Sequence, residues 1–178
     1  MSVALRPYDA ATDADALYEL KVAFERGLGE NTGGDEKATT YEGKLTDEYR
    51  EAWLAWVDRC VADEPRCVTV AVDGSAGNGD DADASLVGYV FCLPERLAFV
   101  WDAAVINELY LAPGHRGTGV ADDLMDAAVD LAADQDLPLD RIVLDVDAAN
   151  ERARAFYARH GFEHWGEMVA RPVGTDLD

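Results

Sequence analysis

The alternation of apolar and polar positions divides the chain into short strands and amphipathic helices. Compact runs rich in β-branched and aromatic residues indicate strands, whereas apolar residues spaced three and four apart indicate helices. Strands are predicted at 2–8, 67–72, 85–93, 105–111, 141–146 and 162–171. Helices are predicted at 13–27, 47–61, 120–135 and 151–160.

The element order β-α-α-β-β-β-α-β-α-β predicts an α/β (α+β) protein built on one mixed sheet. No internal repeat or change of composition marks a boundary, so residues 1–178 are expected to form a single domain, with 172–178 as a loose tail. The polar, glycine-bearing segment 28–44 reads as a long loop, with or without a short helical turn, and 74–83 reads as an acidic hairpin tip.

The strand predicted at 105–111 leads through a glycine-bearing turn into the helix that begins near Val120. Pro113 and Gly114 end the strand, and Gly117 and Gly119 follow. A helix entered in this way directs its unpaired N–H groups and the positive end of its dipole at the turn. Glycine allows a ligand to approach the backbone closely. The pattern therefore predicts a phosphate-binding turn.

Two blocks, in this order, carry a resemblance to a known family. The first is Arg116-x-x-Gly119-x-Ala121, after a strand ending Glu-Leu-Tyr-Leu. The second runs from the strand 142–146 through Asn150 and Phe156-Tyr157 to Gly161-Phe162. Together they resemble the core of the GCN5-related N-acetyltransferase (GNAT) superfamily, closely over residues 103–165. The resemblance implies a mostly antiparallel mixed sheet with splayed central strands, flanked by about four helices.

The resemblance implies acetyl-CoA as co-substrate and no metal. The pantetheine arm would lie between the diverging strands 105–111 and 142–146, and the pyrophosphate would lie on the turn. Arg116 would face a CoA phosphate, or would simply be a solvated arginine. The residues that would bind the cofactor are Leu109, Tyr110, Leu111, Arg116, Gly117, Thr118, Gly119, Val120, Ala121, Asn150, Ala153, Phe156 and Tyr157.

Two side chains are candidates for proton transfer during acetyl transfer to an amine. Glu108 is the candidate general base, acting directly or through water, and its alternative role is an ordinary ion pair at the sheet edge. Tyr157 matches the family tyrosine beside the CoA sulfur and is the candidate general acid. Its alternative role is packing against Phe156. The two motif blocks contain no cysteine, which favours direct transfer in a ternary complex over an acetyl-enzyme.

The acceptor is expected to be a primary amine of a small molecule or peptide. It would enter between segment 28–44, the second helix and the connection 94–102, whose apolar residues should not be freely solvated. Trp53 and Trp56 share a helical face, which indicates core packing or the wall of this pocket. The nearby acids that would favour a cationic amine are Glu30, Asp35, Glu36, Glu42, Glu95 and Asp102.

Two other functional classes compete with the enzyme. A GNAT-fold regulatory module could hold acyl-CoA without turnover, and it would need neither Glu108 nor Tyr157. A dinucleotide-binding domain is disfavoured because Asp122 stands where that fingerprint requires glycine or alanine. The chain also lacks a second βαβ half.

The chain carries a formal charge of −21, from 36 acids against 15 bases. This balance argues against nucleic acid and against anionic membrane surfaces as partners. It suits a high-salt cytoplasm, and therefore a halophile. Cys60, Cys67 and Cys92 lack metal-binding or disulfide spacing and are expected to be reduced. Because the chain ends after one long C-terminal strand, a homodimer through that strand could complete the sheet.

The charge generates a prediction about salt. At molar ionic strength the Debye length is about 3 Å, so that repulsion between surface carboxylates is screened. We expect the melting temperature to rise between dilute buffer and molar KCl, as measured by circular dichroism. A melting temperature that stays constant across this range would contradict the prediction.

Overall fold

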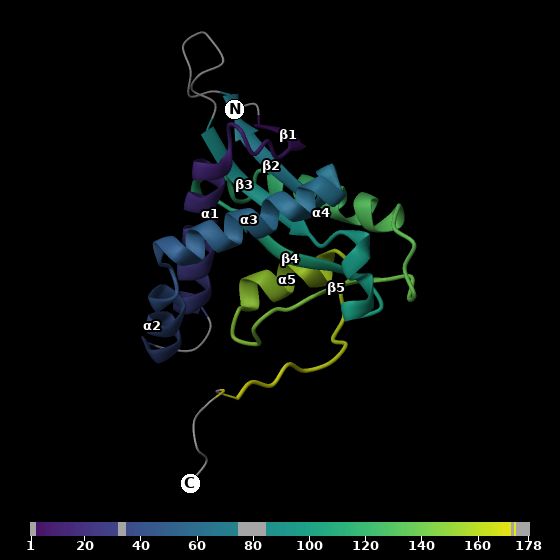
Figure 1. The fold of residues 1–178 in the computed structure, drawn as a ribbon. Helices are drawn as coiled ribbons and strands as arrows, with labels where there is room; N and C mark the ends of the chain where they lie inside the picture. Colours follow the sequence, from purple (N-terminus) through teal and green to yellow (C-terminus); the bar gives the residue numbers. More distant parts are fainter. Residues whose placement is uncertain (1–2, 32–34, 75–84, 172, 174–178) are drawn as a thin grey trace. The chain divides into compact units, whose positions relative to one another are not determined.

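A computed structural model of the chain describes residues 3–31, 35–74, 85–171 and 173 (Figure 1). They form two compact units, 1–144 and 145–178, which are described separately. Except for Gly74, the predicted hairpin tip at 74–83 lies outside the described residues. The same is true of the predicted tail 172–178, except for Val173. No described helix is long and apolar enough to span a bilayer.

The first unit is built on a five-stranded sheet in the order β1-β2-β3-β4-β5. The first four strands pair antiparallel, whereas β4 and β5 are parallel. The sheet is therefore mixed and mostly antiparallel, as predicted. The strands are β1 (Val3–Pro7), β2 (Val68–Asp73), β3 (Ser85–Cys92), β4 (Ala104–Leu111) and β5 (Ile142–Leu144).

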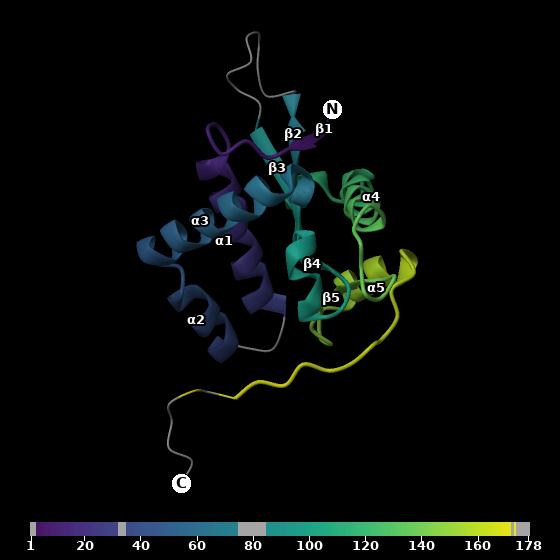
Figure 2. The same cartoon turned by 45° about the vertical axis from the view of Figure 1, so that its right-hand side comes forward.

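Helices cover both faces of this sheet (Figure 2). On one face lie α1 (Ala14–Asn31) and α3 (Asp47–Asp63), with α2 (Asp35–Gly43) against α1. On the other face lies α4 (Val120–Ala133). The side of α4 that faces the sheet is buried and consists of Val120, Leu124, Met125, Ala128 and Leu131. The two helical layers explain why β2 and β3 are almost continuously apolar.

The connections differ from the predicted ones in two places. The described residues of segment 28–44 are mostly helical, because α1 continues to Asn31 and α2 spans Asp35–Gly43, so the predicted helical turn is a helix of nine residues. The connection 94–102 forms a short 3₁₀ helix, Glu95–Val100, and its apolar residues were expected to be covered. That expectation is wrong for Phe99, which is 81% exposed, and for Val100 and Trp101, which are more than half exposed.

Side chains of the two helical layers fill the core as the sequence indicated. Trp53 is buried, and Trp56 packs on Phe91 of β3 with ring centroids 4.9 Å apart, so both tryptophans contribute to core packing. All three cysteines are free and buried. Burial raises the pKa of Cys92 to about 12, which keeps that thiol protonated and unreactive near neutral pH.

The second unit contains α5 (Glu151–Arg159). Asn150 begins the helix by accepting a hydrogen bond from the N–H of Ala153, 3.1 Å away. Gly161, with φ of 83°, ends it. There the N–H of Phe162 donates to the carbonyl of Tyr157, and the N–H of Gly161 donates to that of Ala158, as in a Schellman motif.

The predicted final strand is wrong. Residues 162–171 have no strand structure, and most of their side chains are exposed. A strand needs a partner edge to satisfy its backbone, and apolar residues alone do not supply one. The proposed homodimer through this strand therefore loses the element from which it was inferred.

Candidate active site

Strand β4 changes its environment halfway along its length. Its first residues pair with β5, in the register Ala104–Ile142 to Ile106–Leu144. Beyond Ile106 it pairs with β3 through to Leu111, but within the described residues of the first unit nothing pairs with its other edge. An unpaired edge presents backbone N–H and C=O groups that can bind an extended ligand.

A β-bulge lies at this change of environment. Phe91 pairs with Glu108 while Cys92 pairs with Ile106, so Asn107 is an extra residue on β4. A bulge redirects the side chains around it and is common beside functional sites. Here Asn107 is exposed, whereas Glu108 is directed inward and is only 5% exposed.

The glycine-bearing turn follows directly after β4. Gly117 and Gly119 have φ values of 76° and 94°, which disfavour any residue with a Cβ. Gly119 is the N-cap of α4, and it offers no side chain to the first-turn N–H groups. These groups and the dipole of a 14-residue helix form an anion-binding arrangement.

The other side chains of the turn stabilise its shape. Arg116 donates from Nε to the carbonyl of Leu111, 3.0 Å away, which joins the turn to the end of β4. Thr118 donates from its hydroxyl to the carbonyl of His115 at 2.5 Å. Asp122 and Asp123 lie in the first turn of α4, where they interact favourably with the helix dipole.

The carboxylate of Glu108 lies in a buried polar cluster. Its Oε1 accepts from Nζ of Lys21 at 2.5 Å, and its Oε2 accepts from the hydroxyl of Tyr89 at 2.6 Å. Nδ2 of Asn107 also donates to Oε1, at 3.2 Å. Both carboxylate oxygens are thus bound by donors from α1, β3 and β4 itself.

The charges of the cluster continue from Lys21 toward the surface. Lys21 Nζ also contacts Glu25 Oε1 at 2.5 Å, and Glu25 Oε2 lies 2.8 Å from Nζ of Lys44. Burial alone would lower the pKa of Lys21, but attraction to Glu108 and Glu25 outweighs it and raises the pKa. Lys21 is therefore an ammonium at any working pH.

Two phenols border the same cluster. Burial, together with the carboxylate of Glu108, raises the pKa of Tyr89 well above its usual value. Burial also raises the pKa of Tyr49 on α3. Both phenols are neutral near pH 7, so Tyr89 is a lasting hydrogen-bond donor to Glu108.

The remaining predicted site residues, Asn150, Ala153, Phe156 and Tyr157, belong to the second unit. Asn150 forms the N-cap already described. Tyr157 packs edge-on against Phe156 and Phe162, with ring centroids 5.5 and 5.8 Å away. Burial raises the pKa of Tyr157 to about 12, so its phenol is protonated near neutral pH.

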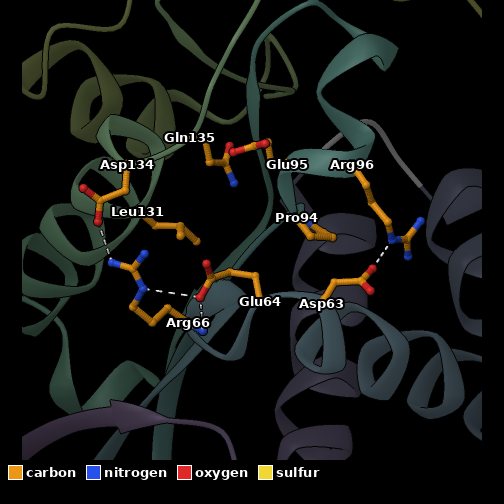
Figure 3. A pocket seen from close by; sticks show the side chains of 9 residues that line it. All are labelled: Asp63, Glu64, Arg66, Pro94, Glu95, Arg96, Leu131, Asp134 and Gln135. Carbon is orange, nitrogen blue, oxygen red and sulfur yellow. Dashed lines mark hydrogen bonds and ion pairs between the residues drawn. The ribbon is translucent and has the colours of Figure 1, made fainter.

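A pocket of about 340 Å³ opens elsewhere in the first unit, beside the C-terminal end of α4 (Figure 3). The helix is about 21 Å long, which separates this pocket from the glycine-bearing turn at the other end. Arg66 lies 2.7 Å from Asp134 and 3.3 Å from Glu64, and Arg96 pairs with Asp63. The pocket is therefore bordered by structural ion pairs, and its position does not suit the cofactor.

Sequence reasoning missed Lys21, Glu25, Lys44 and Tyr89. Lys21 and Glu108 are 87 residues apart, and no local pattern connects them. One signal was present, because Lys21 and Glu25 interrupt the apolar side of α1 beside Leu17 and Phe24. Among the described residues, no group of three or more histidine, cysteine, aspartate or glutamate side chains could hold a metal ion.

A family model for the acetyltransferase (GNAT) family matches residues 33–162, which include β4, the glycine-bearing turn and α5. The chain belongs to the acetyltransferase (GNAT) family. The family and the fold predicted from the two sequence blocks are thereby confirmed.

Known proteins resemble different shares of this GNAT chain. An uncharacterized N-acetyltransferase of Mycobacterium bovis is 43% identical over 66 residues, covering 37% of this chain and 41% of the relative. The match thus spans about two fifths of that relative's length. Phosphinothricin N-acetyltransferase of Streptomyces coelicolor is 29% identical over 136 residues, covering 75% of this chain and 72% of the relative.

A solved structure supports the fold. The PaiA N-acetyltransferase of Thermoplasma acidophilum, crystallised with coenzyme A, superposes with a TM-score of 0.67 at 18% identity. The superposition covers 92% of this chain and 91% of that protein.

The turn generates a prediction about backbone strain. Gly119→Ala should lower the free energy of unfolding by about 1–2 kcal/mol, because alanine is strained at positive φ although the site has room for a Cβ. The measurement is urea denaturation in molar KCl.

The matched control is Gly114→Ala, in the same turn, which also has room for a Cβ but has no positive φ. Its stability should remain within about 0.5 kcal/mol of the wild type. Equal losses in the two variants would show that the φ of Gly119 is not the constraint.

Proposed function

We propose that this chain is an acetyl-CoA-dependent N-acetyltransferase that acetylates a primary amine of a small molecule or peptide. The observation that carries the proposal is the arrangement along β4. An unpaired strand edge begins after Ile106 and leads directly into a glycine-bearing turn and a helix N-terminus. That order suits a ligand with amide groups at one end and a pyrophosphate at the other, which is the chemistry of CoA.

The cofactor roles follow from this order. Backbone groups of Leu109, Tyr110 and Leu111 would hold the pantetheine amides. The N–H groups from Arg116 to Ala121 would hold the pyrophosphate. In the second unit, Asn150, Ala153, Phe156 and Tyr157 are assigned to the cofactor by family likeness. We propose that both units act as one GNAT domain, since the family match at 33–162 crosses the boundary between them.

Acetyl transfer to an ammonium acceptor requires three proton movements. The acceptor ammonium loses a proton to Glu108, directly or through water, and the free amine attacks the thioester carbonyl. The C–N bond forms and the C–S bond breaks. Tyr157 donates its proton to the departing thiolate, and its phenolate then takes the second proton from the acetylated nitrogen, which leaves a neutral amide. A phenol whose pKa is raised to about 12 is protonated at working pH and can serve in that role.

The acidic surface affects how the cofactor binds. CoA carries several negative charges, and the chain has a formal charge of −21. Two carboxylates, those of Asp122 and Asp123, lie in the first turn of α4 itself. At high ionic strength these repulsions are screened, whereas direct hydrogen bonds to the turn persist. Binding is therefore best measured in molar KCl.

The alternative is a GNAT-fold module that binds acyl-CoA without turnover. One observation favours it, because both oxygens of Glu108 already accept hydrogen bonds from other side chains. A carboxylate satisfied in this way is less available as a base. An amine screen that detects release of CoA thiol separates the two functions.

The first test is calorimetric titration with acetyl-CoA, CoA and NAD in molar KCl. Acetyl-CoA and CoA should bind, and NAD should not, because the turn departs from the dinucleotide fingerprint at Asp122. If CoA fails to bind protein that circular dichroism shows to be folded, the proposed function is wrong.

The second test addresses the general acid. Tyr157→Phe should reduce kcat on the order of 10²-fold while leaving acetyl-CoA affinity nearly unchanged, because only the donated proton is lost. The measurements are steady-state thiol release and calorimetry.

The control for this test is Tyr8→Phe, which removes a buried phenol that donates to Asp58 at 3.4 Å and belongs to no predicted site. It should retain full kcat. A Tyr157→Phe enzyme with wild-type kcat would exclude Tyr157 as the general acid.

A further inference from the structure

In the buried cluster around Glu108, the charge of Lys21 affects the proposed proton transfer. The side chains of Lys21 and Glu108 are each only 4% exposed, and their charged atoms are 2.5 Å apart. An ionised carboxylate removed from water is strongly disfavoured unless a cation compensates it. Lys21 is the only cation within hydrogen-bonding distance of Glu108 among the described residues.

The charges of the cluster balance only while Lys21 is present. Glu25 and Glu108 contribute two negative charges, and Lys21 and Lys44 contribute two positive ones. Lys44 contacts Glu25, and its side chain is 37% exposed. If Lys21 lost its charge, Glu108 would keep only neutral donors, those of Tyr89 and Asn107. The buried carboxylate would then have no cation to compensate its charge.

The location of this pair connects it to the unpaired edge of β4. Glu108 follows the bulge at Asn107, where pairing with β5 has ended. Lys21 comes from α1, which carries no part of the cofactor motif. Its ring contacts, Phe24 at 5.2 Å and Trp53 at 5.4 Å, surround the ammonium with aromatic walls. The ammonium is thus held between two carboxylates, those of Glu108 and Glu25, and two aromatic rings.

We propose that Lys21 is a positioning residue, which holds Glu108 ionised and oriented so that Glu108 can accept the proton of the acceptor amine. This inference rests on the proposed acetyl transfer. Lys21 acts only through Glu108 and needs no contact with substrate. As a stable ammonium, it donates to the carboxylate throughout the reaction.

The groups that face the pair define what a pH profile would report. From α1 they are Lys21 and Glu25, from α3 Tyr49, from β3 Tyr89, and from the segment before α3 Lys44. Both phenols have raised pKa values and are neutral near pH 7. The charge of Lys21 is therefore the direct electrostatic support of Glu108.

The test compares the pH dependence of kcat/KM in Lys21→Met, Lys21→Arg and wild-type enzyme. Lys21→Met should move the acid limb to higher pH by on the order of 1–3 units, the usual effect of an adjacent opposite charge. Activity should recover on the alkaline side, and Lys21→Arg should keep the wild-type limb. A purely structural role would lower activity equally at every pH.

Two controls make the comparison specific. Lys37→Met removes a lysine of α2 outside the cluster, and it should leave the acid limb in place. Glu108→Gln should remove the acid limb assigned to Glu108. If Lys21→Met destabilises the fold, Lys21→Met/Glu25→Gln keeps one acid and one lysine in the cluster and should show the same displaced limb.

A readout without turnover separates this inference from the proposed function. The ¹³C carboxyl signal of Glu108 can be followed by NMR through a pH titration in wild type and in the folded Lys21 variants. If the Glu108 midpoint moves upward in the Lys21→Met variant but the wild-type protein acetylates no amine, the electrostatic role of Lys21 is supported and the proposed enzyme function is rejected. An active enzyme whose Glu108 midpoint and acid limb both stay in place would overturn the inference.

Discussion

The ion pair between Lys21 and Glu108 joins the N-terminal helix α1 to strand β4 of the sheet. Neither charge could be buried alone, because the cost of removing an isolated ion from water exceeds what packing returns. The pair therefore requires α1 to pack against β4 with Lys21 next to Glu108. It also places a carboxylate beside the bulge at Asn107, where β4 loses its parallel neighbour.

Strand β4 serves two purposes because only its first part has neighbours on both edges. The segment up to Ile106 is held between β3 and β5 and forms part of the core. The segment from Asn107 to Leu111 retains one partner and leads into the glycine-bearing turn. A fully paired strand would satisfy its own backbone and leave nothing for a ligand. The shortness of β5 therefore matters as much as the turn.

Charge acts on this protein at two scales. On the surface, the excess carboxylates repel one another, and this repulsion is expected to weaken as the salt concentration rises. Inside, two acids and two lysines are paired at 2.5 to 2.8 Å, where screening by salt is weak. Two of the three lysines in the sequence belong to this cluster. The scarcity of lysine elsewhere makes their placement informative.

Local sequence determined the family, the order of most elements and the glycine-bearing turn, because these depend on neighbouring residues. Gly117 and Gly119 must adopt positive φ, and α4 buries its apolar side wherever the sheet lies. Tertiary structure decided the rest. The contacts of Glu108 come from α1 and β3, and residues 162–171 stay irregular although their pattern resembles a strand. Both outcomes depend on long-range contacts, which Glu108 makes with α1 and β3 and which a strand at 162–171 would have needed. Such contacts join residues far apart in the chain, so they leave no periodic pattern in the local sequence.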